Sequence, residues 1–358
     1  MAKTVIAHFV NNLQLGGVLS VIENYCSLLD SNLFEHHIIY IGEEDKNTYD
    51  HLISKGYILH KTAARRKHLL KNLIEVKTLF KNNHFDVVHS HLSESSFIPL
   101  YFAKKAKVPI RIAHCHNYDV RKKNIIQTAL FGISKKMTNR YCNKMVACGV
   151  DAGKYLFGKK PFVVLKNAID VDKYRYNSSI REKLLRDYNI KKGSIVVGNI
   201  GRLCNQKNQM FLLDIFKELN KNIYLVMIGS GPDENRLLET TKQINSDRII
   251  MLKERKDAFL FYNLFDVFVL PSLWEGLPVV GVEAQASGLP CIFSDNITSE
   301  IKILPSSIYL PLNKANWIKR LNSFKNDNNR VEYFQLIKEN YCIDAVRNSI
   351  LSLYTAEK

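Results

Sequence analysis

The feature that most constrains the fold is the alternation of short apolar, β-branched runs with longer stretches of helical pattern. Residues 4–10, 85–91, 195–201 and 266–271 (TVIAHFV, FDVVHSH, IVVGNIG and DVFVLP) have the character of strands, and Gly17–Leu29 that of a helix. Strand–helix alternation without hairpin signals is typical of α/β proteins, whose parallel sheets are covered on both faces. Two such series in 358 residues predict two doubly wound, Rossmann-like domains.

A polar, charged stretch at residues 171–193 separates the two series, and a buried-type strand at residues 195–200 follows it at once. We therefore expect an N-terminal domain over residues 1–170 and a C-terminal domain over residues 171–340. The final segment, about residues 340–358, has a helical pattern and is able to pack back onto the first domain.

The chain carries a formal net charge of +17, and the excess is concentrated in one region. Residues 51–200 hold 30 Lys and Arg against 9 Asp and Glu. Such a bias indicates nucleic acid, an anionic membrane or an anionic substrate. Within it, residues 65–80 and 121–140 combine apolar positions with cations. Both segments fit helices in a membrane interface, and equally fit amphipathic helices that cover the sheet.

The seven cysteines are scattered and form no C-x-x-C pair, which argues against zinc and disulfides and favours free thiols in a reducing cytoplasm. The apolar run at residues 5–10 is too short for a secretory leader. No segment approaches the ~18 apolar residues of a membrane span. We expect a cytoplasmic protein without a transmembrane helix.

Two glycine- and cation-bearing loops follow predicted strands. Gly16 and Gly17 lie between the first strand and a helix, where glycine lets the backbone approach an anion; a tight turn without ligand is an equal alternative. Arg202 and Lys207 follow the first strand of the second series, at the sheet edge where ligands of such folds bind. Two cations there are able to clamp a diphosphate without a metal, unless both are merely solvated.

The segment PSLWEGLPVVGVEAQASGLP at residues 271–290 holds two carboxylates in apolar surroundings. Glu275 lies in a loop after a strand, and Glu283 lies in the following helix. Gly276 and Leu277 place backbone N–H groups near the start of that helix. The segment is therefore suited to binding sugar hydroxyls through carboxylates and an anion through amides.

Together these segments resemble the retaining glycosyltransferases of family 4, which have the GT-B fold. The matching motifs are GG at 16–17, NAID at 167–170, GRLxxxKN at 201–208, GSGP at 229–232 and the EGLP…EAxAxGxP segment. The pattern is most similar to bacterial capsular and exopolysaccharide glycosyltransferases. The resemblance implies two Rossmann-like domains facing a cleft, with a nucleotide-sugar as co-substrate and no metal or other cofactor.

The resemblance also implies roles at matching positions. Arg202 and Lys207 would neutralise the leaving diphosphate, Glu283 would bind the ribose and Glu275 the donor sugar. The amides of Gly276 and Leu277 would face the sugar or phosphate, and Gly16 and Gly17 would approach the phosphate from the other domain. A histidine after the fifth strand would line the sugar pocket: His116 is the better match and His114 the alternative. We expect these two side chains to face opposite ways, so that one serves packing alone.

The resemblance predicts transfer from a UDP-hexose or UDP-N-acetylhexosamine to a lipid-pyrophosphate-linked saccharide, by a protein bound peripherally to the inner face of the cell membrane. A GT-B-fold UDP-sugar epimerase is the alternative, and the GRL…KN segment and the spaced glutamates favour transfer. A nucleic-acid-binding protein is a weaker alternative, since no helix-turn-helix, zinc-finger or RNP signature is present. Asp170-Val171-Asp172 matches a metal-binding D-x-D motif, but it lies in the interdomain stretch, so no metal role is expected.

Overall fold

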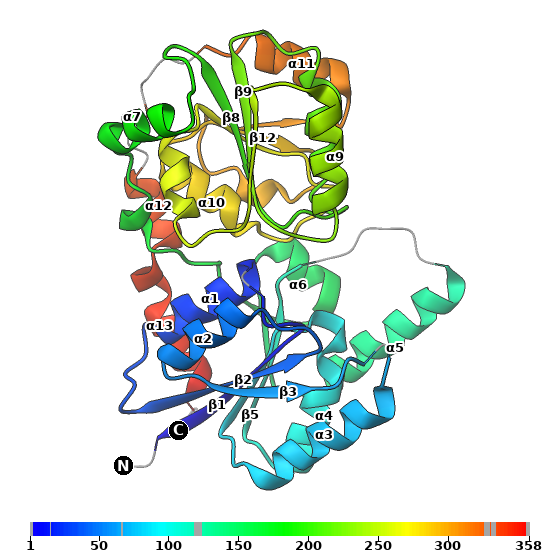
Figure 1. Cartoon of the computed structure of the whole chain (residues 1–358). Helices are drawn as coiled ribbons and strands as arrows, with labels where there is room; N and C mark the ends of the chain where they lie inside the picture. Colours follow the sequence, from blue (N-terminus) through cyan, green and yellow to red (C-terminus); the bar gives the residue numbers. More distant parts are fainter. Residues whose placement is uncertain are drawn as a thin grey trace. The chain divides into compact units, whose positions relative to one another are not determined.

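The computed structural model describes residues 3–14, 16–65, 67–117, 124–325, 330 and 334–355. The chain divides into two compact units (Figure 1). The N-terminal unit comprises Met1–Ala168 together with Ile343–Lys358, and the C-terminal unit comprises Ile169–Cys342. In the described part of the chain, no helix is both long and apolar enough to cross a membrane.

The N-terminal unit is built on a seven-stranded parallel sheet with the order β3-β2-β1-β4-β5-β6-β7. The strands are β1 Thr4–Val10, β2 Phe34–Ile41, β3 Ile58–Thr62, β4 Val87–Ser90, β5 Ile110–Cys115, β6 Lys144–Ala147 and β7 Val163–Val164. The helices are α1 Gly17–Cys26, α2 Lys46–Ser54, α3 Leu69–Asn82, α4 Phe97–Lys105, α5 Ile125–Tyr141 and α6 Val150–Phe157, with the short 3-10 helix η1 Ser93–Ser96.

The C-terminal unit is built on a six-stranded parallel sheet with the order β10-β9-β8-β11-β12-β13. The strands are β8 Ile195–Ile200, β9 Ile223–Ile228, β10 Ile249–Leu252, β11 Val267–Leu270, β12 Cys291–Ser294 and β13 Ile308–Leu310. The helices are α7 Ser178–Asp187, α8 Gln209–Phe216, α9 Glu234–Ile244, α10 Val279–Ala286, α11 Lys314–Asn322 and α12 Phe334–Tyr341, with 3-10 helices η2 Val171–Tyr174, η3 Ala258–Asn263 and η4 Ser299–Ile301.

The apolar composition of the strands follows from their position between two layers of helices. All six residues of β9 are buried, as are the four of β11, because each strand contacts helices or loops on both faces. Phe211 of α8 packs edge-on against the fully buried Trp317 of α11 in the core of this unit. The expected fold class of two doubly wound parallel-sheet domains is confirmed.

The strand order places ligand-binding loops at one point in each sheet. The order reverses direction between β1 and β4 in the N-terminal unit, and between β8 and β11 in the C-terminal unit. In doubly wound sheets, ligands bind beyond the carboxyl ends of the strands at such a switch point. The loop after β1 ends at Gly16, and Gly17 begins α1; the loops after β8 and β11 contain Lys207 and Glu275.

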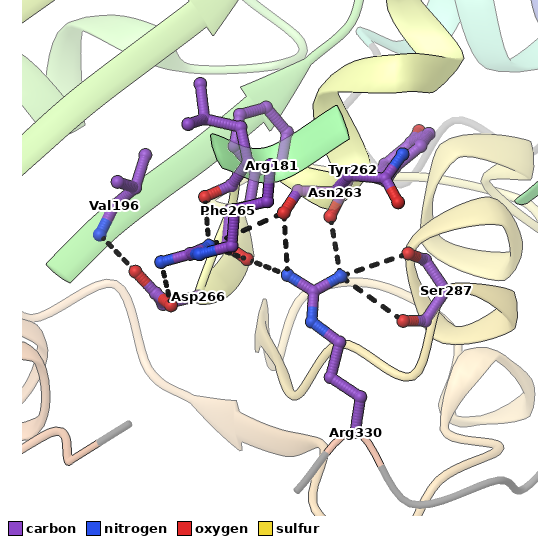
Figure 2. A network of polar contacts seen from close by, with 9 residues as sticks. Arg181, Val196, Tyr262, Asn263, Phe265, Asp266, Ser287 and Arg330 are labelled. Carbon is purple, nitrogen blue, oxygen red and sulfur yellow. Dashed lines mark hydrogen bonds and ion pairs between the residues drawn. The ribbon is translucent and has the colours of Figure 1, made fainter. Parts of the chain in front are cut away.

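The opposite, amino-terminal edge of the second sheet is held by a network around two arginines (Figure 2). Arg181 of α7 pairs with Asp266 at 2.8 Å, and the other carboxylate oxygen of Asp266 accepts from the Val196 N–H of β8 at 2.8 Å. Arg330 donates to the carbonyl oxygens of Tyr262, at 2.9 Å, and Phe265. The network fixes the start of the sheet, so its charges have a structural role away from the switch point.

The end of the chain belongs to the N-terminal unit. There η5 Ile343–Val346 leads into α13 Arg347–Tyr354. The Tyr354 hydroxyl lies 2.8 Å from Nδ1 of His89 in β4. Lys144 of β6 donates to the carbonyl oxygens of Ser352 and Leu353 at 2.8 and 3.0 Å. These contacts attach α13 directly to the sheet.

Candidate functional site

Three loops of the C-terminal unit meet at the carboxyl ends of β8, β9 and β11. The Leu203 N–H donates to the Ser230 carbonyl at 2.9 Å, which joins the loop after β8 to the loop after β9. The Leu273 N–H donates to the Gln206 carbonyl at 2.8 Å, which joins the loop after β8 to the loop after β11. The carbonyl groups at the loop ends are thus satisfied by neighbouring loops, which gives the switch point a defined shape.

The glycines of the GSGP segment allow this close approach. A Cβ on Gly229 would lie 2.0 Å from the Gly201 carbonyl oxygen, and a Cβ on Gly231 would lie 2.2 Å from the Leu203 carbonyl oxygen. Gly229 also has a φ of +156°, a value that residues with a side chain rarely adopt. Both positions therefore require glycine, because any larger residue would push the two loops apart.

A buried ion pair lies at the centre of the loops. Lys207 Nζ is 2.6 Å from Glu275 Oε1, and the two side chains are 16% and 8% exposed. Gln206 donates from Nε2 to the Trp274 carbonyl at 2.9 Å and lies 3.4 Å from the second Glu275 oxygen. Removing one partner of such a pair leaves an uncompensated buried charge. The structure thus brings together two of the residues that the sequence nominated separately.

Three other residues that the sequence analysis nominated lie in the same loops as the Lys207–Glu275 pair. The Arg202 side chain is exposed, and its carbonyl accepts from Gln209 Nε2 at 3.0 Å. Gly276 and Leu277 are buried in the loop that leads into α10, where Pro278 is the N-cap. Proline lacks an N–H group, so Gly276 and Leu277 supply the backbone amides that precede the helix start.

Glu283 of α10 is held by two tyrosines. Its carboxylate accepts from the Tyr174 hydroxyl at 2.8 Å and from the Tyr262 hydroxyl at 2.7 Å. Burial raises the pKa of Glu283, and the two hydroxyl hydrogen bonds oppose that rise. Burial also raises the pKa of both tyrosines, so each stays a donor at neutral pH. The sequence analysis missed Tyr174 and Tyr262, which lie in short 3-10 helices without a recognisable motif.

In the N-terminal unit, Gly16 is the N-cap of α1 and Gly17 is its first residue. Both are exposed, and the Gly16 carbonyl accepts from the Ser20 N–H at 3.0 Å in the first turn. No side chain caps this helix start. The helix therefore presents its first backbone N–H groups past residues that have no side chain.

His114 and His116 are both buried, at 0% and 8% exposure. The expectation that they face opposite ways is wrong, because their rings stack with centroids 3.8 Å apart. Residues two apart along an extended strand share one face. Burial lowers the pKa of both imidazoles, that of His116 to about 4. The structure therefore does not separate a site histidine from a packing histidine.

Three further histidines join this pair and were missed in the sequence analysis. His8 of β1 and His89 of β4 are register partners, and His91 directly follows β4. The ring of His91 is 5.0 Å from that of His116, measured between centroids. The signal was present in the spacing of the HSH and HCH triplets, each of which puts two imidazoles on one side of a strand.

Two parallel-sheet units with a cation–carboxylate pair at a switch point are suited to binding an anionic ligand such as a nucleotide. Comparison with known proteins specifies the class. Residues 15–173 match the model of Glycosyltransferase Family 4, and residues 180–339 match that of Glycosyl transferases group 1. The chain belongs to the family 4 glycosyltransferases, as the sequence motifs indicated.

Two relatives and one solved structure illustrate the relationship. The chain is 31% identical over 314 residues to the putative glycosyltransferase EpsF of Bacillus subtilis, covering 83% of this chain and 80% of EpsF. It is 29% identical over 243 residues to the Escherichia coli UDP-Gal:alpha-D-GlcNAc-diphosphoundecaprenol alpha-1,3-galactosyltransferase, covering 63% and 62%. The structure resembles Anabaena Alr3699/HepE, solved in complex with UDP-glucose, with a TM-score of 0.82, 14% identity, and 98% and 99% coverage.

Proposed function

We propose that this glycosyltransferase moves a sugar from a UDP-hexose or UDP-N-acetylhexosamine to a lipid-diphosphate-linked saccharide, with retention of configuration and without a metal. The buried Lys207–Glu275 pair carries the proposal. The name of the Escherichia coli relative supports it, since it specifies a UDP-Gal donor and a diphosphoundecaprenol-linked acceptor. Assembly of a surface polysaccharide is the process in which such an acceptor is extended.

The pair is suited to a reaction that creates charge. As the bond between the sugar and the diphosphate breaks, negative charge grows on the leaving group and positive charge grows on the ring. Lys207 would turn from Glu275 toward the diphosphate, and Arg202 would reach it from solvent. Glu275 would then accept from sugar hydroxyls. Fixed cations take the place that a metal ion holds in other transferases, and one such group contributes about 3 kcal/mol.

Glu283 would select the nucleoside. Its two carboxylate oxygens are fixed by Tyr174 and Tyr262, so the group has a defined orientation before any ligand arrives. Each oxygen keeps further acceptor capacity, which suits the two hydroxyls of a ribose. A deoxyribose donor would lose one of these hydrogen bonds and bind more weakly.

Calorimetry across UDP-, GDP- and TDP-sugars tests donor binding, and we expect UDP-sugars to bind. Binding to none of the three classes contradicts the proposal. Glu275→Gln keeps the shape of the side chain but removes its charge, and it should lower turnover sharply. Lys183→Ala is the matched control, because Lys183 forms an exposed pair with Asp187 at 2.9 Å. Conversion of the free UDP-sugar into its epimer would instead identify an epimerase.

The same proposal places the protein on the inner face of the cell membrane. Helices α3 and α5 both pack against α4 (Figure 1). Both helices expose large apolar side chains. On α3 these are Leu69, Leu70 and Ile74, and on α5 they are Ile125, Ile126, Leu130 and Ile133. Helix α3 also carries Lys71, Lys77 and Lys81, and helix α5 carries Lys135, Lys136 and Arg140. Apolar side chains flanked by cations suit an anionic bilayer surface.

Flotation with phosphatidylglycerol vesicles tests this placement, with phosphatidylcholine vesicles as the reference. We expect binding to the anionic vesicles only, and a several-fold loss of binding in the Ile126→Asp variant. Val164→Asp is the control, since Val164 is 38% exposed on an edge strand outside α3 and α5. Equal binding of both vesicle types, or stronger binding to duplex DNA at the same salt concentration, contradicts the membrane assignment.

A further inference from the structure

Four imidazoles of the N-terminal unit form a continuous chain across the sheet. His116 Nε2 lies 2.7 Å from His91 Nδ1, and His91 Nε2 lies 3.3 Å from His8 Nδ1. His8 Nε2 in turn lies 3.3 Å from His36 Nδ1 in β2. Each contact joins the Nδ1 of one ring to the Nε2 of the next. We call these four residues the imidazole chain.

The chain is electrically neutral at physiological pH. Burial lowers the pKa of all four rings, to about 4 for His36 and His116 and well below the usual 6.5 for His8 and His91. A neutral imidazole has one N–H donor and one bare nitrogen. Each of the contacts within the chain therefore needs a hydrogen on one side and a lone pair on the other.

This requirement couples the tautomers. His8 and His91 use both ring nitrogens in the chain, so a ring that donates on one side must accept on the other. The direction of donation is then the same at every contact. Because every contact links an Nδ1 to an Nε2, all four rings must carry their hydrogen on the same kind of nitrogen. Only two arrangements remain, all Nδ1–H or all Nε2–H.

We propose that His91 and His8 are positioning residues, which hold His116 in a single tautomer through the imidazole chain. The inference rests on the proposed function together with the role that the family resemblance implies for His116, which is to line the sugar pocket. Its Nε2 is occupied by His91, the Asn167 side chain is a further hydrogen-bond partner of the ring, and Nδ1 is buried. Whether that nitrogen donates or accepts is set by the whole chain, which ends at the partly buried His36 beside the Cys26 thiol at 3.4 Å.

A metal ion is the competing occupant of this region. Among the described residues, three groups place possible ligand atoms within 4.8 Å of one another: His8, His89 and His91; His8, Cys26 and His36; and His91, His114 and His116. However, the chain nitrogens face each other in pairs at 2.7–3.3 Å, whereas metal ligands direct their lone pairs at one shared point. The geometry therefore favours hydrogen bonds.

Nitrogen-15 spectroscopy of the full chain, labelled on its histidine rings and kept in EDTA at pH 7.5, reads the tautomers directly. Single His→Gln variants assign the signals. We expect His8, His36, His91 and His116 to be neutral, each in one tautomer, and all protonated at the same kind of nitrogen. Mixed kinds of nitrogen, or tautomers that average in any of the four rings, overturn the proposal. In a second sample without EDTA, stoichiometric binding of added Zn²⁺ that shifts these signals also overturns the proposal.

His8→Phe cuts the chain between His91 and His36. We expect His116 to lose its single tautomer and the transferase kcat to fall about 10-fold, with an unchanged KM for the donor, because the ring that lines the sugar pocket is no longer held in one form. His60→Gln is the control, since His60 pairs with His37 at 2.8 Å in the same sheet but outside the chain. If His8→Phe does not fold, His36→Phe removes the partly exposed end, and the three remaining rings should still agree with one another.

The imidazole chain, its positioning role and the proposed function can be refuted separately. If the four rings share one kind of nitrogen but His116→Gln retains full activity, the chain is real and its positioning role is refuted. If the rings disagree while donor binding and transfer are intact, the proposed function stands without the chain. A wild-type kcat in His8→Phe also contradicts the positioning role.

Discussion

The two units bury polar groups of different chemistry. The interior of the N-terminal unit holds the neutral imidazoles of His8, His89, His91, His114 and His116. The interior of the C-terminal unit instead holds charged pairs, Arg181 with Asp266 and Lys207 with Glu275. A buried neutral imidazole destabilises the fold when it takes up a proton, whereas burial raises the pKa of Asp266 despite the opposing attraction of Arg181. The stability of the N-terminal unit should therefore respond most to acid, and that of the C-terminal unit to the loss of single charges.

The largest difference should appear on acidification. The N-terminal histidines have a pKa below 6.5 in the folded state, so below pH 6.5 the unfolded chain binds protons that the folded unit does not. Stability is therefore complete above pH 6.5 and is lost as the pH falls, by up to about 1.4 kcal/mol per pH unit for each histidine. Burial raises the pKa of Asp266 and Glu283, so these groups change stability in the opposite direction.

Hydrogen exchange measured by mass spectrometry between pH 7.5 and 5 tests this difference unit by unit. We expect β1, β4 and β5 to lose protection first, while β8 and β11 stay protected. Simultaneous loss in both units, or earlier loss in the C-terminal unit, would show that the buried histidines do not govern acid stability.

The second-largest effect should be on turnover, when one charge of the C-terminal unit is removed. Lys207→Ala deprives the leaving diphosphate of a fixed cation and should lower kcat by about 10²- to 10³-fold. It also leaves the Glu275 carboxylate buried without its partner. Steady-state kinetics beside the Lys183→Ala control measure the effect. A kcat within threefold of the wild-type value would show that Lys207 is not part of the catalytic site.

Substitution of a closely packed glycine should have an intermediate effect, a loss of stability that is confined to the C-terminal unit. Gly231→Ala would place a Cβ 2.2 Å from the Leu203 carbonyl oxygen and should destabilise the C-terminal unit by about 1–3 kcal/mol. Gly132→Ala is the control in the N-terminal unit, because its new Cβ would meet nothing within 4 Å, and helix α5 should gain stability. Urea denaturation monitored in each unit compares them. Equal effects would indicate that the loops after β8 and β9 can separate freely.

The smallest expected effect concerns the attachment of α13. Tyr354→Phe removes the hydroxyl that lies 2.8 Å from His89 Nδ1 and should cost about 1 kcal/mol, since one buried hydrogen bond is lost. Thermal unfolding beside the exposed Tyr49→Phe variant checks it. An unchanged melting temperature would mean that the contacts of Lys144 alone hold the helix.

The parallel sheets were predictable because their strands are apolar on both faces, as in IYLVMI of β9. The strands β3, β7 and β13 were missed for physical reasons. The strand β13 has only the three half-buried residues IYL at the edge of its sheet. β3 is the half-polar sequence ILHKT at a sheet edge, and β7 is only two exposed valines. Their pairing comes from neighbouring strands, so local composition carries little sign of it.

The loops of the candidate site were predictable from the sequence, but the contacts between their side chains were not. The glycines and the Lys207 segment follow strands and have recognisable spacing. The contact of Lys207 with Glu275 depends on β8 and β11 being neighbours, which residues 68 positions apart do not reveal. The tyrosines on Glu283 and the imidazole chain likewise form only when strands and 3-10 helices distant in sequence meet.

The most direct test of the account is the mass of the product formed from a UDP-sugar and an undecaprenyl-diphosphate-linked saccharide. We predict that the wild-type protein adds one sugar residue to the acceptor in the presence of EDTA, that Lys183→Ala does the same, and that Lys207→Ala forms almost none. An unchanged acceptor mass with every UDP-hexose and UDP-N-acetylhexosamine, or full activity in Lys207→Ala, would contradict the proposed reaction and its site.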